Sequence, residues 1–246
     1  MNEVEKKRYS RQINLDSVGI DGQQKLLSSK VLIIGFGGLG TGVAMFLTRM
    51  GIGQLGIIDN DVVDISNLQR QILYSEDDVG KGKVKVGVKK LKEINKNIII
   101  DEYDFLLNSL NAKSIIEKYD VIVDCTDNFY TRGIISRTCV ENRKKCVFGA
   151  VSEFNGFIFT HVENSACFEC IIGDYEKLCE QKSTVGVMGA MVGIISSMQA
   201  LEVIKLILGI GSLAINKMIV VDGNDFSTSI IPISRNNNCY CKRNCL

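Results

Sequence analysis

The sequence predicts an α/β protein: a doubly wound, Rossmann-like and mainly parallel sheet, with a C-terminal antiparallel extension and a structural zinc site. Three observations predict it. Apolar runs alternate with helical patterns, a glycine-rich turn follows the first run, and nine cysteines include two clusters. The 246 residues, 46% of them hydrophobic, can bury one large core without disulfides. We expect a single domain over 1–246, with an N-terminal helical arm (1–29), a nucleotide-binding core (30–150) and a final portion (151–246).

The core opens with a strand, a glycine turn and a helix. Lys30–Ile34 is a short apolar run, and Gly35-Phe-Gly-Gly-Leu-Gly40 closes it. The apolar stretch Val43–Met50 then predicts a helix, which Gly51-Ile-Gly-Gln54 ends. A second strand follows at Leu55–Ile58, so this segment forms one βαβ unit.

The alternation continues to residue 148. Val84, Val88, Leu91 and Ile94 have the spacing of an amphipathic helix. The remaining expected elements are a strand at Ile98–Ile100, a strand at Val121–Cys125, a helix at Tyr130–Asn142 and a strand at Lys145–Phe148.

The pattern changes after Gly149. Strands are expected at Phe157–Val162 and Met218–Asp222 without regular crossovers between them, which favours antiparallel pairing. A polar loop, 173–182, precedes the long uncharged run Ser183–Leu201. Glycine, serine and glutamine interrupt this run, so we expect a buried helix and no membrane segment.

The net charge and the N-terminal sequence limit the possible binding partners and the cellular compartment. The chain has 29 Lys and Arg against 28 Asp and Glu, a net charge of +1. The overall charge therefore does not favour binding to nucleic acid or to an anionic membrane. The charged N-terminus lacks the apolar run of a signal peptide, which indicates a cytoplasmic protein. In that compartment clustered cysteines more often bind metal than form disulfides.

The glycine turn predicts a nucleotide site. Its glycines allow a phosphate to approach the backbone, and the following helix N-terminus offers N–H groups and partial positive charge. Asp59 ends the second strand, where it could accept from a ribose hydroxyl. NAD, FAD and ATP all use such a crevice, but no P-loop motif is present.

Downstream cations favour ATP among these nucleotides. Ser66-Asn-Leu-Gln-Arg-Gln71 and Gly80-Lys-Gly-Lys83 bring Arg70 and Lys83 near the crevice if the segment lies over it. Asp127 follows the fourth strand, where a carboxylate and phosphate oxygens together suit Mg²⁺. Asp127 is equally suited to cap the next helix, and the two roles are compatible.

The positions of the cysteines and of the single histidine indicate different roles. Cys167-x-x-Cys170 has zinc-knuckle spacing, and Cys239, Cys241 and Cys245 supply the other candidate ligands. Cys125, Cys139 and Cys146 fall in strand or helix patterns and are expected to be buried. His161, in a strand, is expected to be structural.

Together these residues resemble the adenylyltransferases of the ThiF/MoeB/HesA group, relatives of the ubiquitin-activating enzymes. The matching segments span nearly the whole chain: Arg8-Tyr-Ser-Arg-Gln12, Gly35–Gly40, Asp59–Asp61, Ser66–Gln71, Lys83, Cys125–Asn128, Cys167–Cys170 and Gly186-Val-Met188. The resemblance implies that ATP and Mg²⁺ bind and that the C-terminal Gly-Gly carboxylate of a ubiquitin-like sulfur-carrier protein attacks the α-phosphate. An acyl-adenylate and pyrophosphate result, for sulfur transfer in thiamin or molybdopterin biosynthesis.

The resemblance also assigns roles by position. Gly38 lines the phosphates, Asp59 holds the ribose, Asp127 holds Mg²⁺, and Arg11 reaches the ATP site of the neighbouring protomer in a homodimer. Asn67, Arg70 and Lys83 contact phosphates and, with Arg11 and Asp127, form the expected catalytic set. The full nucleotide-binding set expected from these motifs is Gly35, Gly37, Gly38, Gly40, Asp59, Asp61, Ser66, Asn67, Arg70, Lys83, Asp127 and Asn128. Residues 151–246 would then serve carrier binding, dimerisation and zinc.

The chain departs from the family pattern at two places. Lys242 stands where the fourth zinc ligand is expected, so Cys241 or Cys245 must substitute. Lys182 stands where some members carry a cysteine that handles sulfur, and whether Cys179 replaces it stays open. We expect the sulfur donor to be a separate protein.

Three other functions are alternatives. A family relative could adenylate a peptide or another acid. An NAD-dependent oxidoreductase would lack an evident proton donor and would leave Arg11, Arg70 and Lys83 unexplained. A non-catalytic nucleotide-binding scaffold would be expected to have this charged set disrupted, and the set is intact.

Overall fold

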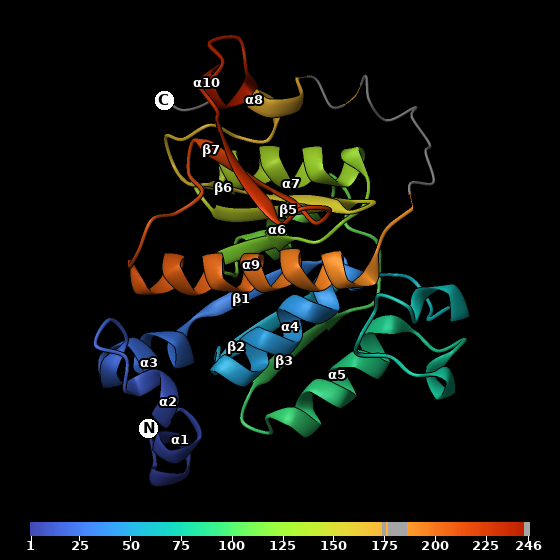
Figure 1. Cartoon of the computed structure of the whole chain (residues 1–246), viewed down its shortest axis with the longest axis vertical. Helices are drawn as coiled ribbons and strands as arrows, with labels where there is room; N and C mark the ends of the chain where they lie inside the picture. Colours follow the sequence, from blue (N-terminus) through green and yellow to red (C-terminus); the bar gives the residue numbers. More distant parts are fainter. Residues whose placement is uncertain (174–175, 177–185, 244–246) are drawn as a thin grey trace.

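The computed structural model describes residues 1–173, 176 and 186–243, and Figure 1 shows its elements around one twisted sheet. The eight strands lie in the order β3-β2-β1-β4-β5-β6-β7-β8. Their bounds are β1 Lys30–Ile34, β2 Gln54–Ile58, β3 Ile99–Tyr103, β4 Val121–Asp124, β5 Lys145–Ser152, β6 Asn155–His161, β7 Lys217–Asp222 and β8 Ser227–Pro232. This order is that of a doubly wound sheet with an added antiparallel edge.

The helices connect and cover these strands. The α-helices are α1 Glu3–Arg8, α2 Ser10–Ile13, α3 Gly19–Ser28, α4 Gly38–Met50, α5 Lys83–Ile94, α6 Ala112–Ile116, α7 Phe129–Glu141, α8 Glu169–Ile172, α9 Gly189–Leu208 and α10 Tyr240–Arg243. Two short 3₁₀ helices, η1 Ile65–Asn67 and η2 Glu76–Asp78, lie between β2 and α5.

The parallel half of the sheet contains β1 to β5. β1 pairs in parallel with both β2 and β4, and these two strands are bonded in turn to β3 and β5. Four of the five residues of β1 are buried, as expected for a central strand covered on both faces. The strand order reverses between β1 and β4, and ligands of such sheets bind at the carboxyl ends of the strands at this point.

The predicted antiparallel extension is confirmed, and it has one strand more than predicted. β5 and β6 form a hairpin, β7 pairs with β6, and β8 pairs with β7, all antiparallel. The six residues of β8 are all exposed, so no alternation of apolar and polar residues marks this strand in the sequence.

Most predicted elements are present with shifted ends. The first core helix begins at Gly38 rather than Val43, because the end of the glycine turn already forms its first turn. The third strand lies at Ile99–Tyr103 rather than Ile98–Ile100, and its charged residues lie on the sheet edge. The fifth strand extends to Ser152, since the hairpin continues its pairing with β6.

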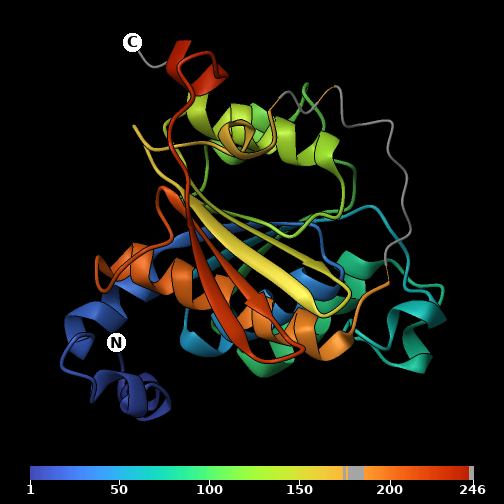
Figure 2. The same cartoon turned by 45° about the horizontal axis from the view of Figure 1, so that its top comes forward.

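Two apolar clusters cover the two faces of the sheet. On one face α4, α5 and α9 pack against alternate residues of the strands, such as Val31, Ile33 and Val123. On the other face α6 and α7 pack against Leu32, Ile122 and their neighbours. Figure 2 shows α9 and α7 on opposite sides of the strands, so the molecule is a three-layer sandwich.

The long uncharged run contributes the central helix α9. In the described part of the chain it alone is long and apolar enough to cross a membrane, by length and composition. It packs against α4, β5 and β6 in the core, and two of its side chains, Gln199 and Glu202, are fully buried with hydrogen-bond partners. The prediction of a buried helix is therefore confirmed.

Candidate functional site

The glycine turn lies at the carboxyl end of β1, against the loop that follows β4. A Cβ atom at Gly40 would lie 2.0 Å from the carbonyl oxygen of Gly35, so the turn closes too tightly for any side chain there. Gly35 has φ +88°, and a Cβ atom there would lie 2.7 Å from the carbonyl oxygen of Cys125. These close approaches place the two loops side by side and leave the N-terminus of α4 at the crevice.

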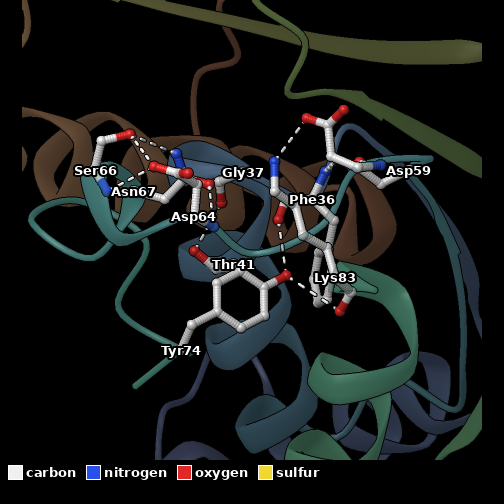
Figure 3. A network of polar contacts seen from close by, with 10 residues as sticks. Phe36, Gly37, Thr41, Asp59, Asp64, Ser66, Asn67, Tyr74 and Lys83 are labelled. Carbon is white, nitrogen blue, oxygen red and sulfur yellow. Dashed lines mark hydrogen bonds and ion pairs between the residues drawn. The ribbon is translucent and has the colours of Figure 1, made fainter. Parts of the chain in front are cut away.

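Asp59 is held against the glycine turn. Its Oδ2 accepts from the backbone N–H of Phe36 at 2.6 Å (Figure 3). Its Oδ1 accepts from the N–H of Asp61 at 2.8 Å. The carboxylate is half-buried at the end of β2. It therefore has a defined orientation at the position where a Rossmann-like protein binds a ribose.

The segment with Asn67 and Arg70 lies beside the same turn. Asp64 caps η1, since its Oδ1 accepts from the N–H and the hydroxyl of Ser66 (Figure 3). The Cγ atom of Arg70 lies 3.5 Å from where a Cβ atom of Gly38 would be, and its Nη1 donates to the carbonyl of Ser66 at 3.0 Å. The arginine predicted to contact phosphate is thus adjacent to the glycine turn.

Lys83 begins α5 on the other side of the turn. The residue is only 5% exposed, and its Nζ lies 2.8 Å from Oδ2 of the exposed Asp61. Tyr74 ties this helix start to the turn, because its hydroxyl lies 3.0 Å from the carbonyl of Phe36 and 3.3 Å from that of Lys83 (Figure 3). Burial raises the pKa of Tyr74, so it remains a neutral donor.

Gln71 also faces the turn, although the sequence reasoning gave it no role. It is 4% exposed, and its Nε2 lies 3.3 Å from where a Cβ atom of Gly37 would be. Its buried Oε1 has no hydrogen-bond partner in the described part of the chain. In the sequence, only its position directly after Arg70 in the Ser66–Gln71 segment indicated that Gln71 could lie at the site.

Asp127 and Asn128 lie on the loop between β4 and α7. Asn128, not Asp127, is the N-cap of α7, because its Oδ1 accepts from the N–H of Thr131 at 2.8 Å. The suggestion that Asp127 caps the helix is therefore wrong. Asp127 is exposed at the carboxyl edge of the sheet, on the loop whose first residues, Cys125 and Thr126, lie against Gly35 of the glycine turn.

Arg11 lies far from this crevice. It belongs to α2, whose neighbour Gln12 donates to the carbonyl of Met50 at the C-terminal end of α4. The glycine turn is at the other end of α4, and 13 helical residues span about 20 Å. An arginine side chain cannot bridge that length, so Arg11 does not reach the crevice of its own chain.

Four cysteines from two distant segments meet near the end of α7. The sulfur atoms of Cys167, Cys170, Cys239 and Cys241 all lie within 4.8 Å of one another. Three of these separations are 3.9 Å (Cys167 to Cys170), 3.4 Å (Cys167 to Cys239) and 3.5 Å (Cys170 to Cys241). Tetrahedral zinc with Zn–S bonds of about 2.3 Å separates its sulfurs by about 3.8 Å, so the cluster fits zinc.

Hydrogen bonds from the neighbouring C-terminal segment hold the cysteine cluster. The N–H of Asn236 donates to Sγ of Cys170 at 3.5 Å, and Arg235 donates to the carbonyl of Cys241 at 2.7 Å. Such contacts fix the orientation of the sulfur atoms. The other candidate ligand, Cys245, lies outside the described residues, as do Cys179 and Lys182.

The other cysteines in the described part of the chain and the histidine are buried. Cys125, Cys139 and Cys146 are buried, as expected. His161 is 3% exposed, and its Nδ1 lies 3.0 Å from the carbonyl of Ala166. Burial lowers its pKa, so the ring is neutral and enclosed in the protein.

Fold and site together define a class: a doubly wound α/β protein with a nucleotide-type glycine turn, two cationic side chains beside it and a separate cluster of four cysteines that could hold a metal ion. Residues 9–242 match the ThiF family, which confirms the resemblance found in the sequence. The chain belongs to the ThiF family.

Relatives of different total length share this domain. The chain is 40% identical over 237 residues to "Adenylyltransferase and sulfurtransferase MOCS3-1" of Drosophila pseudoobscura pseudoobscura, covering 95% of this chain and 52% of that protein. It is 37% identical over 241 residues to "Sulfur carrier protein ThiS adenylyltransferase" of Escherichia coli (strain K12), covering 97% and 96%. The chain thus spans about half the length of the first of these relatives.

Solved structures agree with the fold. MccB of E. coli, crystallised with ATP, superposes with a TM-score of 0.86 at 27% identity, covering 98% of this chain and 75% of that one. MccB with MccA-N7isoASN gives a TM-score of 0.85 at 27% identity, covering 96% and 74%.

Proposed function

We propose that this chain is an adenylyltransferase that uses ATP and Mg²⁺ to activate the C-terminal glycine carboxylate of a ubiquitin-like sulfur-carrier protein. The observation that carries the proposal is the convergence of Arg70 and Lys83 on the glycine turn that begins α4. Two cations beside a helix N-terminus suit the charge of a triphosphate better than that of a dinucleotide. Relatives named ThiS adenylyltransferase and MOCS3 support the same activity.

The reaction is a nucleotidyl transfer. A carboxylate oxygen of the carrier bonds to the α-phosphorus of ATP, the bond to the β-phosphate breaks, and pyrophosphate leaves with its electron pair. No protein nucleophile is required, since positioning and charge neutralisation promote the attack. The glycines of the turn (Gly35, Gly37, Gly38 and Gly40) let the phosphates approach, while Asp59 holds the ribose and Asn67, Arg70 and Lys83 contact phosphate oxygens.

In this proposal Lys83 exchanges its partner when the nucleotide binds. Its Nζ is paired with Asp61, whose side chain is 62% exposed, so the pair can open toward the crevice at small cost. Asp61, Ser66 and Asn128 then border the nucleotide, and Asp127 provides the carboxylate for Mg²⁺, which supplies charge neutralisation at the phosphates.

The proposed active unit is a homodimer. Arg11 lies about 20 Å from its own glycine turn by the length of α4, so a role at the phosphates requires a second copy of the chain. Phe46 on α4 and Leu201 on α9 are apolar side chains that are 39% and 54% exposed. Burial of such residues against a partner favours association through these helices.

The four cysteines Cys167, Cys170, Cys239 and Cys241 are proposed to bind Zn²⁺ as a structural ion. The four sulfur atoms would fill the four positions of a tetrahedral ion, so a bound zinc would have no open position for catalysis. Bound zinc would join the segment after β6 to the C-terminal segment. We expect the sulfur donor to be a separate protein and the pathway to be thiamin or molybdopterin biosynthesis. We also expect the protein to act in the cytoplasm and to bind neither nucleic acid nor a membrane.

A second candidate substrate has support of its own. The similarity to MccB solved with MccA-N7isoASN keeps adenylation of a peptide or another acid as the alternative. The oxidoreductase is less well supported, because the only histidine of the chain is buried away from the crevice in hydrogen bonds of its own strand and loop.

The deciding experiment is ATP–pyrophosphate exchange with purified carriers that end in Gly-Gly. We expect exchange only when a carrier with a free C-terminal carboxylate is present, and no exchange with the same carrier lacking its last glycine. Exchange with a short peptide but with no carrier from the same organism would replace the proposal by its alternative.

A further inference from the structure

A buried ion pair lies directly beneath the loop that bears Asp127. Asp124, the last residue of β4, is 0% exposed, and Arg132 on α7 is 6% exposed. Nε of Arg132 lies 3.1 Å from Oδ2 of Asp124. Burial raises the pKa of Asp124, and the charge of Arg132 opposes that rise.

The pair holds Thr126 from both sides. Oδ1 of Asp124 accepts from the N–H of Thr126 at 3.0 Å and from its hydroxyl at 2.6 Å. Nη2 of Arg132 donates to the carbonyl of Thr126 at 2.5 Å and to the carbonyl of Gly149 on β5 at 2.7 Å. Every backbone polar group of Thr126 is thereby fixed, and Asp127 is the next residue.

The guanidinium also has a supporting surface. Its Cζ lies 5.8 Å from the ring centroid of Phe168, which is 1% exposed and follows the zinc-ligand candidate Cys167. The N–H of Phe168 donates to Oγ of Ser136 on α7 at 3.2 Å. The cysteine cluster and the Asp127 loop are therefore joined through one stack of buried side chains.

Stability alone does not explain a charge pair at this place. Two buried charges lose more hydration than a well-packed apolar pair of the same size, so such pairs contribute little net stability. Arg132 donates to two backbone carbonyls, that of Thr126 on the loop after β4 and that of Gly149 on β5. Its geometry suits fixing the conformation of that loop.

We propose that Arg132, paired with Asp124, is a positioning residue that holds the Thr126–Asp127 loop in the conformation needed to bind Mg²⁺ with ATP. The inference rests on the proposed nucleotide site. It predicts a specific defect: loss of the arginine fork raises the Mg²⁺ requirement, while the nucleotide contacts of the glycine turn, Arg70 and Lys83 persist.

The test is calorimetric titration of ATP into the full-length protein over a range of Mg²⁺ concentrations, which requires no carrier. For Arg132→Lys, which keeps the charge but not the fork, we expect the half-saturating Mg²⁺ concentration to rise about tenfold, with ATP affinity without Mg²⁺ within about twofold of wild type. Arg143→Lys, an exposed arginine just beyond α7, is the matched control and is expected to leave both values unchanged.

A milder variant covers the case in which Arg132→Lys does not fold. Thr126→Val keeps the ion pair and the backbone contacts and removes only the hydroxyl bond to Asp124, so a rise of about threefold in the Mg²⁺ requirement is expected. Unchanged Mg²⁺ dependence in the folded variants would overturn the inference, as would an equal loss of ATP affinity with and without Mg²⁺. If wild type binds Mg²⁺ and ATP but supports no exchange with any carrier, the proposed function fails while the inference about Arg132 stands.

Discussion

The backbone N–H of Phe36 donates to Oδ2 of Asp59 at 2.6 Å, which joins the middle of the glycine turn to the end of the neighbouring strand. One carboxylate thus defines both the position of the turn and its own orientation toward the crevice. The same turn folds back on itself at Gly40, and the side chain of Phe36 packs in the core beneath it, so both backbone contacts and packing define its shape.

Alanine at Gly40 is expected to deform this turn. Its Cβ atom would lie 2.0 Å from the carbonyl of Gly35, so backbone must move, and we expect a loss of about 1–3 kcal/mol in the free energy of unfolding together with loss of ATP binding. Gly193→Ala on α9 is the control, because a Cβ atom there meets nothing within 4 Å; a gain of about 0.5–1 kcal/mol is expected. Urea unfolding and calorimetry measure both, and equal stability of the two variants would contradict the reasoning.

Asp127→Ala is expected to abolish Mg²⁺-dependent ATP–pyrophosphate exchange, by at least about 100-fold, with the fold retained. The side chain is exposed and does not cap α7, so its removal leaves the helix and the loop bonds of Asp124 in place. Asp16→Ala, another exposed aspartate, serves as the control. Exchange near the wild-type rate would remove Asp127 from the Mg²⁺ site.

Two inactive variants should restore activity when mixed. If Arg11 acts in the neighbouring protomer, Arg11→Ala and Asp127→Ala are each inactive, but a mixed dimer has one site with an intact Asp127 and an intact Arg11. Random mixing makes half of the dimers mixed, so we expect about a quarter of the wild-type exchange rate, because one of two sites is active in each. No recovery after proven subunit exchange would show that Arg11 does not act across the dimer.

The cysteine cluster is expected to hold about one zinc per chain, measured by elemental analysis. Cys241→Ser should lose most of the metal, because Cys241 occupies the fourth position next to Cys170. Cys245→Ser is the matched comparison and should retain it. The reverse result would assign the fourth ligand to Cys245. Acidification should release the zinc, since protons compete for the thiolates.

Asp78 should make the fold sensitive to acid. Burial opposes its ionisation, but hydrogen bonds from Lys90 and from Ser75 outweigh burial and lower its pKa to about 2. A folded pKa below the unfolded value of 3.8 means that this stabilisation is present above pH 4 and is lost as the pH falls toward 2. In urea unfolding, Asp78→Asn should be less stable by about 1–2 kcal/mol at pH 7 and should lose less stability than wild type between pH 4 and 2. Parallel pH profiles for the two proteins would exclude this role.

The parallel half of the fold was predictable because its central strands β1, β2 and β4 are buried on both faces. Continuous apolar runs such as Lys30–Ile34 and Val121–Cys125 stand out between helical patterns, and the glycine turn marks the first crossover. β8 was not predictable, since it is exposed along its whole length and forms because the open edge of β7 offers hydrogen-bond partners.

The glycine turn, Asp59, Arg70 and Lys83 follow one another in a recognisable order, so a nucleotide site could be predicted from the sequence. Only the tertiary structure decided which side chains meet. It placed Gln71 against Gly37, set Arg132 beneath the Asp127 loop, gave the helix cap to Asn128, and brought Cys241 to three cysteines. Hydrogen bonds and metal ligation act over only about 2–3.5 Å, and spacing along the chain does not specify distances between segments that the sheet brings together.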